Sequence, residues 1–558
     1  MSFSNRFSRR EVLAEVPLAL AGAAGIANRA FAQVPEYVEV KTRYGRLRGA
    51  RTGNLTTFKG VPYGGSVSGA NRFKAAPPLK PWDGVRDALE LGAPSIQPGQ
   101  RRNEPPQDEN CLFLNIWTPA ADNRKRPVMF YSHGGGFTTG SGGAAYQDGG
   151  NLARTFDVVV VATNHRLGLM GYLYLGELGG EEYATSGNQG LLDIRDGLKW
   201  ARENVQGFGG DPANVMIFGE SGGGAKTSCL YAMPAAAPYF NKGSIESGPG
   251  IRMMPRDAAA ETTLMVLQHL GIEKSDWRKL LEVPAEKLLE AQTGLGRTGG
   301  GPLGMNGGRK GMGGGSRPGG FGPVVDGSVL PHHPFDPVAP AISKNKPLIV
   351  GYNHDETVFF FNQRRDMDVF KLTEEALKER LAKEFPGNDA AIFEAYHKSR
   401  PDASPSQLYV AITTARMIGI GAVTIAERKY AQHGAPAYTY IFKHANQTVI
   451  PGTQFKMGSP HAMEITYKFY NVHPAGQEGA NPGRGLMSIS DPASLKAAHN
   501  MAEMWSTFAR TGHPVAKGQP EWPPYTTEKR ATMEIDSECT VVNDPYPLER
   551  KLWERLDP

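Results

Sequence analysis

Residues 215–224 read Val-Met-Ile-Phe-Gly-Glu-Ser-Gly-Gly-Gly, an apolar run suited to a buried strand that stops at a serine set among glycines. Glycine stands two positions before and two positions after Ser221. This is the G-x-S-x-G pattern, in which a tight strand-to-helix turn admits only small residues at those positions and exposes the serine hydroxyl. The stretch predicts an α/β fold with a nucleophilic serine. Such a serine needs a base, an acid and an oxyanion site.

Short β-branched or aromatic runs alternate with helical patterns along the rest of the chain. The expected strands are residues 128–132, 158–163, 215–218, 348–351 and 438–442, and residues 190–205 have the periodicity of an amphipathic helix. Such alternation is typical of a large, mostly parallel central sheet flanked by helices. In such sheets ligands bind beyond the carboxyl ends of the strands, so the catalytic groups are expected there.

The composition is that of a globular protein with a sizeable core, because 40% of the 558 residues are apolar and 21% are charged. We expect a single α/β domain with long insertions over residues 33–558. The formal net charge of +5 is small for this length, and no Lys/Arg block is interleaved with aromatic residues. A nucleic-acid partner therefore has no support. Outside the N-terminal segment no uninterrupted apolar run is long enough to predict a membrane span.

Cysteine is scarce, since Cys111, Cys229 and Cys539 are the only three in the chain. They are too few and too scattered for a metal cluster or a disulfide framework, so at most one bridge is possible. Cys229 falls on the helix expected after Ser221 and is interpreted as a small buried hydrophobic residue. Neither a metal nor a cofactor is expected.

The N-terminus has the features of an export signal. Residues 8–13 read Ser-Arg-Arg-Glu-Val-Leu and precede the small and apolar run 16–27, and Ala30-Phe31-Ala32 offers a cleavage site. We expect a twin-arginine type signal over residues 1–32 and a periplasmic or secreted protein. The alternative is an ordinary amphipathic helix, because Glu15 and Pro17 interrupt the apolar run.

Residues 294–322 depart from globular composition, because about half of them are glycine and none is acidic. Ordering such a backbone is entropically costly, so a mobile basic loop is expected. One interpretation is an adaptable rim that attracts acidic substrates or surfaces. The other is a tolerated low-complexity insertion without a function.

An acyl-transfer serine generates an oxyanion that backbone N–H groups must stabilise. The turn itself supplies the N–H of Gly222, the residue after the serine. Residues 133–137 read His-Gly-Gly-Gly-Phe and follow the expected strand 128–132 directly. Glycines let a backbone approach a substrate oxygen closely, so Gly135 and Gly136 are predicted to complete the oxyanion hole.

Several further motifs accompany these. The chain contains Asp-Glu-Asn-Cys-Leu-Phe-Leu-Asn at 108–115, Asn-His-Arg-Leu-Gly at 164–168, Gly-Asn-Gln-Gly-Leu-Leu-Asp at 187–193, Phe-Gly-Gly-Asp-Pro at 208–212 and Trp-Pro at 522–523. Together with the glycine motifs they resemble the type-B carboxylesterases, relatives of the cholinesterases, over nearly all of the chain after the N-terminal signal. The resemblance implies the α/β-hydrolase fold and a Ser-Glu-His triad.

The base must be one of thirteen histidines. The α/β-hydrolase order of serine, acid and histidine favours those late in the chain. Of these, His461 lies in Gly-Ser-Pro-His-Ala-Met-Glu-Ile, residues 458–465, which resembles the histidine loop of the family. His444 and His473 are its rivals.

The acid should hold the imidazole in its tautomer and stabilise the imidazolium that forms. Residues 351–357 read Gly-Tyr-Asn-His-Asp-Glu-Thr after the apolar run 348–350 and resemble the segment in which the family places a glutamate. The resemblance therefore implies Glu356. Asp355 and Asp326 are competitors, the latter more simply interpreted as a turn carboxylate.

The same resemblance implies supporting roles for other residues. Glu109 and Arg166 are expected to form an ion pair beneath the site, and Asp193 to anchor the helix it begins. Glu220 is expected to support the site from behind the serine. Ser247 resembles a family serine that hydrogen-bonds near the triad and is a poor nucleophile candidate, because it lacks the tight turn.

The chain departs from the family pattern at two places. The family usually has alanine after the nucleophile, where this chain has Gly222, which predicts a looser or roomier oxyanion hole. The family cysteine expected before Gln97 is replaced by Ser95 or Ile96, so Cys111 lacks its usual disulfide partner.

These features predict a serine hydrolase that cleaves small-molecule or polymer carboxylic esters through an acyl-enzyme. An amidase, a carbamate hydrolase or a polyester hydrolase with the same triad is the alternative, because the choice of leaving group depends on pocket walls that the motifs do not specify. A non-catalytic adhesion module on the same fold is a further alternative. Such a module would have no reason to keep nucleophile, acid and base together.

Overall fold

The computed structural model describes residues 36–101, 103–298, 318–472 and 491–556. The export signal expected at 1–32 lies outside the described residues, and so does most of the glycine-rich segment. The start of that segment, residues 294–298, forms the end of helix α7 (Ala285–Thr298) and is not a loop. The prediction of a loop from glycine content is wrong at these residues. Packing of the preceding turns stabilises the helix, although glycine is unfavourable in a helix.

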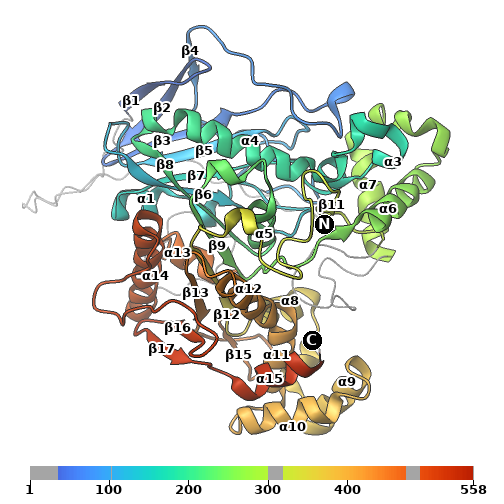
Figure 1. Cartoon of the computed structure of the whole chain (residues 1–558), viewed down its shortest axis with the longest axis vertical. Coiled ribbons are helices and arrows are strands. Elements are labelled where there is room, and N and C mark those ends of the chain that lie inside the picture. Colours follow the sequence, from blue (N-terminus) through green and yellow to red (C-terminus); the bar gives the residue numbers. More distant parts are fainter. Residues whose placement is uncertain (1–35, 102, 299–317, 473–490, 557–558) are drawn as a thin grey trace, which may run out of the picture. The chain divides into compact units, whose positions relative to one another are not determined.

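One sheet of 13 strands organises the described chain and runs from β1 and β4 at the top of Figure 1 to β16 and β17 near its lower end. Its strands are β1 (Glu36–Lys41), β2 (Arg46–Thr52), β3 (Leu55–Pro62), β4 (Val85–Asp87), β5 (Phe113–Thr118), β6 (Arg126–Ser132), β7 (Val159–Thr163), β8 (Gly210–Glu220), β9 (Lys242–Glu246), β12 (Leu348–Asn353), β13 (Ala437–Phe442), β16 (Ala531–Ile535) and β17 (Thr540–Asn543). The order is β1-β2-β3-β5-β7-β6-β8-β9-β12-β13-β16-β17, with β4 on β2. All five expected strands are present within it.

Neighbouring strands from β7 to β16 are parallel, and the strands added at either end are antiparallel except β4, which pairs parallel with β2. Two small sheets stand apart, β10 (Met254–Pro255) with β11 (Val324–Val325) and β14 (Asn446–Val449) with β15 (Lys456–Gly458). The mostly parallel centre puts the carboxyl ends of β6, β8, β12 and β13 at one edge, where the loops after them meet.

Helices cover both faces of the sheet (Figure 1). They are α1 (Gly150–Phe156), α2 (Gly168–Tyr172), α3 (Gly176–Gly179), α4 (Gln189–Asn204), α5 (Gly222–Ala232), α6 (Arg256–His269), α7, α8 (Thr357–Arg364), α9 (Glu374–Glu384), α10 (Asp389–Ser399), α11 (Pro405–Thr414), α12 (Ile420–Tyr430), α13 (Glu464–Lys468), α14 (Pro492–Thr511) and α15 (Pro547–Leu556). Apolar residues of α4, α5 and α12 pack in one core, and those of α1, α13 and α14 pack in a second. The helix expected at 190–205 is α4.

The central strands bury both of their faces, which explains their continuous apolar runs. In β6, Val128 and Phe130 belong to the core under α4 and α5, whereas Met129 and Tyr131 belong to the core under α14. Successive side chains of a strand point to opposite faces, so one short run supplies both cores.

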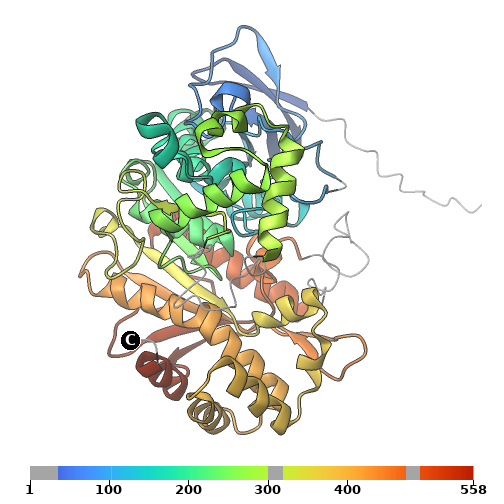
Figure 2. The same cartoon turned by 90° about the vertical axis from the view of Figure 1, so that its right-hand side faces the viewer.

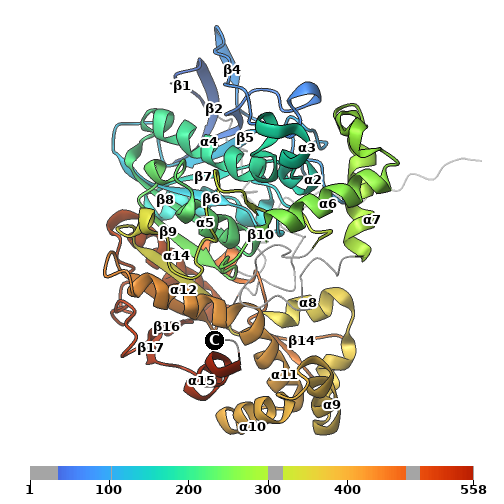
Figure 3. The same cartoon turned by 45° about the vertical axis from the view of Figure 1, so that its right-hand side comes forward.

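A third apolar cluster joins α8–α11 to the C-terminal helix α15, at the lower end of Figures 2 and 3. Helix α11 continues through a π-helical segment (Ala415–Gly419) into α12. Within the described residues, this 26-residue stretch is the one helix long and apolar enough to cross a bilayer, and 67% of its most apolar window is buried inside the protein.

The ion pair expected between Glu109 and Arg166 is wrong. Arg166 instead binds Asp193, with Nε and Nη2 at 2.8 and 2.7 Å from the two carboxylate oxygens, and both side chains are buried. Glu109 pairs with Arg72, whose Nη2 lies 2.5 Å from Oε1. Asp193 also lies one turn inside α4 and does not begin it. Sequence separation alone does not show which of several distant carboxylates an arginine reaches.

Cys111, Cys229 and Cys539 are all free and buried, and the interpretation of Cys229 as a small buried hydrophobic residue is confirmed. Cys229 lies on α5 and packs in the core under that helix.

Replacing Asp193 with alanine should lower the free energy of unfolding by about 3–5 kcal/mol, because it leaves the buried Arg166 guanidinium without its counter-ion. Denaturant unfolding measures the change. The matched control is Lys287→Ala, which breaks the exposed Lys287–Glu290 pair and should change stability by less than about 1 kcal/mol. Equal losses in the two variants would contradict the structural role given to Asp193.

Candidate active site

Ser221 lies on the tight turn between β8 and α5, as the motif predicts. Its backbone adopts φ 58° and ψ −123°, a conformation that non-glycine residues rarely occupy. A Cβ at Gly219 or Gly223 would stand closer than 3.0 Å to the carbonyl oxygen of Ser132 at the end of β6. Both positions therefore need glycine because a neighbouring backbone passes within contact distance.

The structure brings Ser221, His461 and Glu356 together, although the first two are separated by 240 residues. His461 Nε2 lies 2.8 Å from Ser221 Oγ, and His461 Nδ1 lies 2.5 Å from Glu356 Oε2. The exposed fractions are 6% for Ser221, 3% for His461 and 0% for Glu356. A hydroxyl, an imidazole and a carboxylate in this order can move a proton from oxygen to ring nitrogen.

The neighbouring Asp355 faces away from the imidazole of His461. Its Oδ1 lies 2.9 Å from His354 Nδ1, and its Oδ2 accepts a hydrogen bond of 2.9 Å from the Ser459 N–H. Although burial opposes it, the contact with His354 and the Ser459 N–H hold the pKa of Asp355 below its ordinary value. Asp355 thus fixes the loop that carries His461, while Glu356 reaches its ring.

The remaining rivals lie elsewhere. His444 contacts Asp536 at 2.6 Å and Ser494 at 2.9 Å, in a separate polar cluster. Asp326 accepts hydrogen bonds from the N–H groups of Ser328 and Leu330, as a turn carboxylate does. His473 lies outside the described residues.

Buried polar groups surround Glu356. Burial raises its pKa to about 8, while hydrogen bonds from Ser247 and from the Asn353 N–H stabilise its anion and oppose that rise. Ser247 therefore lies near the triad, as expected, and its Oγ also contacts Glu464 at 3.4 Å. Burial raises the pKa of Glu464 to about 7 against the attraction of Lys468.

Some contacts in the site have no sequence motif from which they could have been predicted. Asn353 donates through Nδ2 to the Pro460 carbonyl and to Glu464, which ties β12 to the loop of His461. The ring of Phe360 lies 4.6 Å from the imidazole of His461. Glu220 contacts the same imidazole, with Oε1 3.3 Å from Nε2, the nitrogen that also contacts Ser221 Oγ.

The glycine loop lies directly against the serine. Gly135 and Gly136 have φ +87° and +63°, conformations that favour glycine. In the described part of the chain their backbone N–H groups donate no hydrogen bond. Gly222 is the first residue of α5, and the first N–H groups of a helix have no acceptor within it. All three residues that the sequence singled out thus meet around Ser221 with N–H groups available.

The space beside Gly222 is not roomy, contrary to expectation. A Cβ there would stand closer than 3.0 Å to the carbonyl oxygen, the carbonyl carbon and the Cα of Gly136. The backbone of Gly136 occupies the volume that an alanine methyl would take. The missing side chain at Gly222 predicts a roomier oxyanion hole, but the backbone of Gly136 fills the space beside it.

Comparison with known proteins agrees with this geometry. The model of the Carboxylesterase family matches residues 36–553. The chain belongs to the carboxylesterase family. It is 34% identical over 517 residues to the para-nitrobenzyl esterase of Bacillus subtilis, covering 92% of this chain and 97% of that one.

Solved structures confirm the α/β-hydrolase fold. A carboxylesterase from Geobacillus stearothermophilus is 35% identical, with a TM-score of 0.77 over 92% of this chain and 99% of that chain. An esterase from Clostridium hathewayi that can hydrolyze aliphatic aromatic polyesters is 29% identical, with a TM-score of 0.74 over 94% of this chain and all of that chain. The protein is a carboxylic ester hydrolase, and the alternative of a non-catalytic adhesion module is set aside.

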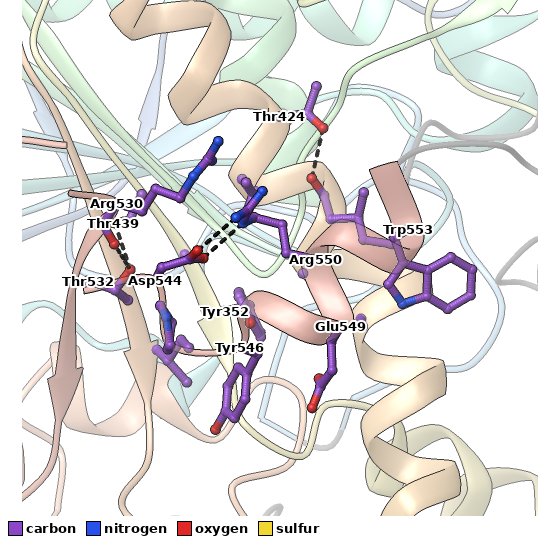
Figure 4. Close-up of a pocket in the computed structure, with 18 of the residues that line it drawn as sticks. Tyr352, Thr424, Thr439, Arg530, Thr532, Asp544, Tyr546, Glu549, Arg550 and Trp553 are labelled. Carbon is purple, nitrogen blue, oxygen red and sulfur yellow. Dashed lines mark hydrogen bonds and ion pairs between the residues drawn. The ribbon is translucent and has the colours of Figure 1, made fainter. Parts of the chain in front are cut away.

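The carboxylesterase also contains a cavity of about 270 Å³ that the triad residues do not line (Figure 4). Its walls come from β12, β13, β16, α12 and α15, and Tyr352 and Tyr546 lie on one side of it. The arginines on its walls already bind carboxylates, as Arg400 binds Glu549 at 2.7 Å.

Gly222→Ala should cut kcat at least tenfold, because the new methyl group displaces the Gly136 backbone from the oxyanion hole. Steady-state kinetics on a nitrophenyl ester measures it. The matched control is Gly197→Ala on α4, where a Cβ would approach nothing closer than 3.2 Å and activity should be retained. Wild-type kcat in the Gly222→Ala enzyme would show that the close packing has no bearing on turnover.

Proposed function

We propose that this carboxylesterase hydrolyses esters through an acyl-enzyme on Ser221, with His461 as general base and acid and Glu356 as the carboxylate that orients it. The observation that carries the proposal is the unbroken pair of hydrogen bonds, 2.8 Å from Ser221 Oγ to His461 Nε2 and 2.5 Å from His461 Nδ1 to Glu356 Oε2.

The reaction proceeds in two halves. Ser221 Oγ attacks the ester carbonyl while His461 Nε2 takes its proton and passes it to the leaving alcohol. Water then attacks the acyl-enzyme with His461 again as base, the bond from the acyl carbon to Ser221 Oγ breaks, His461 returns the proton to Oγ, and the acid product leaves. Glu356 stabilises each imidazolium, because the positive ring and the hydrogen bond from the Asn353 N–H favour its carboxylate against the burial that raises its pKa.

The negative oxygen that forms in each half is assigned to the N–H groups of Gly135, Gly136 and Gly222. Donors placed in advance of the reaction need no reorganisation as charge develops, and each is worth about 3 kcal/mol. Support comes from the position of these glycines around Ser221 and from the absence of competing acceptors for Gly135 and Gly136 within the described residues.

The substrates are proposed to be small-molecule esters, with polymer esters as a second class. The relatives support both, since one is named for para-nitrobenzyl esters and another hydrolyses polyesters. Amides and carbamates are more demanding because their leaving groups are poorer, so they form the comparison class in the test.

Export is proposed as well. The paired Arg9 and Arg10, the apolar run and the Ala30-Phe31-Ala32 site support it, and so does the start of the family match at residue 36, just beyond the expected cleavage point.

The wild-type enzyme should hydrolyse a series of nitrophenyl esters of increasing acyl length at least 100-fold faster than a nitroanilide. A polyester suspension tests the second proposed substrate class, the polymer esters. Ser221→Ala should lose about 10⁴-fold or more of kcat, because the nucleophile is gone. Initial rates followed at the nitrophenolate absorbance provide the measurement. Equal turnover by the serine variant would refute the assigned nucleophile, and preference for the anilide would refute the ester class.

A matched pair of isosteric variants identifies the acid. Glu356→Gln should lower kcat by about 10³–10⁴-fold, because the carboxylate no longer stabilises the imidazolium. Asp355→Asn is the corresponding isosteric change at the adjacent carboxylate. It should lower kcat far less, since Asp355 faces His354 and Ser459. An active Glu356→Gln enzyme beside an inactive Asp355→Asn enzyme would assign the role to the wrong carboxylate.

The export proposal predicts that Arg9→Lys/Arg10→Lys retains the precursor in the cytoplasm, because twin-arginine transport requires the paired arginines. Cell fractionation followed by N-terminal sequencing of the mature protein checks this, with Gln33 as the expected first residue. Unchanged secretion of the double variant would contradict the signal type.

A further inference from the structure

Lys226 occupies an unusual place for a lysine. It is the fifth residue of α5, one turn beyond Ser221, and its exposed fraction is 0%. Its Nζ donates a hydrogen bond of 2.9 Å to the carbonyl oxygen of His133, the residue before the glycine loop. The same Nζ lies 5.7 Å from the centre of the Phe137 ring, the residue after that loop. One ammonium group therefore contacts both flanks of Gly134–Gly136.

Among the described residues, Lys226 has no carboxylate as a counter-ion. In the described part of the chain it forms no ion pair, and the titratable groups that face it are His133, His165 and Cys229. The two imidazoles stack at 4.4 Å, and burial followed by the charge of Lys226 holds the pKa of each well below its ordinary value. Burial raises the pKa of the Cys229 thiol, so this group is uncharged too.

Packing alone does not require a lysine here. Ala225, Cys229 and Leu230 on α5 are fully buried apolar residues, and the buried hydroxyls of Thr227 and Ser228 donate to backbone carbonyls of the same helix and not to Lys226. An ammonium without a carboxylate partner is costly to bury, whereas an apolar side chain of similar length carries no such cost. A residue that lowers stability at this point, five positions from the nucleophile, points to a role in the reaction.

We propose that Lys226 is a positioning residue of the oxyanion hole, holding the glycine loop at both ends through the His133 carbonyl and the Phe137 ring. The inference rests on the proposed function, because it takes Gly135 and Gly136 as oxyanion donors. The loop needs such support, since its glycines restrict the backbone little. A cation beneath it also favours the negative charge that develops above it.

Protonation of Lys226 connects this role to pH. Burial lowers its pKa to about 7, so the ammonium is lost as pH rises through that value. The unfolded chain keeps the proton up to a much higher pH, so the cost of burying the charge is fully present below pH 7 and diminishes above it. Removing the charge should therefore leave the protein as stable at pH 6, or more so, while weakening the loop.

The test is Lys226→Met, which keeps the length of the side chain and removes the charge. We expect kcat to fall 10- to 100-fold at pH 6.5 with KM changed less than threefold, and the melting temperature to stay equal or rise. In the wild type kcat should decline at alkaline pH, and the variant should lack that decline. Inhibition by a trifluoromethyl ketone, which forms an oxyanion on the serine, should weaken in proportion to kcat.

The control is Lys429→Met on α12. Lys429 is likewise buried, with its pKa lowered to about 8 by burial, and it donates to the Ser343 carbonyl at 3.0 Å, away from the glycine loop. It should retain wild-type kcat. If Lys226→Met fails to fold, Lys226→Gln keeps a donor for the His133 carbonyl and should give an intermediate kcat without the alkaline decline.

The outcomes separate the two proposals. Wild-type kcat and inhibition in Lys226→Met, or the same alkaline decline in that variant, would overturn the role of Lys226. So would a loss of kcat that only follows a lower melting temperature. Full activity of Ser221→Ala would instead overturn the proposed function, whatever Lys226→Met shows.

Discussion

The whole site depends on how closely backbones pack around Ser221. Its strained φ of 58° holds the hydroxyl away from the turn, and glycines allow neighbouring chains to meet it. A Cβ at Gly223 would collide with the end of β6, one at Gly248 with the carbonyl of Ser221, and one at Gly222 with the glycine loop. Because three backbone segments share this small volume, close main-chain packing sets where the nucleophile and its oxyanion donors lie.

The electrostatics of the site follow from burial on both sides of the serine. On the acid side Glu356, Glu464 and Glu246 are fully buried, and Lys468 pairs with Glu246. On the oxyanion side Lys226, His133 and His165 are buried without a carboxylate among the groups that shift the pKa of Lys226. Carboxylates thus lie behind the imidazole that becomes positive, and a cation lies beneath the loop that receives negative charge. This distribution suits the charge separation of acyl transfer.

Local sequence predicted the parts of the site that short motifs encode. The turn at Ser221 and the glycines at 135 and 136 require special backbone geometry, which only certain residues allow, so their pattern is readable. His461 and Glu356 were identified through the family resemblance of their loops. Only the fold shows that His461 contacts Ser221 and that Glu356 contacts His461. The pairing of Arg166 with Asp193 was missed, because contacts between distant segments leave no local signal. The importance of Lys226 and Asn353 was missed for the same reason.

The sequence by itself determined which catalytic groups this carboxylesterase has and their order along the chain. They are a glycine loop after an early strand, a serine on a tight turn, and an acid and a histidine later in the chain. These are local constraints on backbone shape and residue size, so they survive without knowledge of the fold. The tertiary structure decided which carboxylate faces His461, what fills the space beside Gly222 and what the buried Lys226 contacts. Those outcomes depend on the approach of segments far apart in sequence, and close packing allows only one arrangement of them.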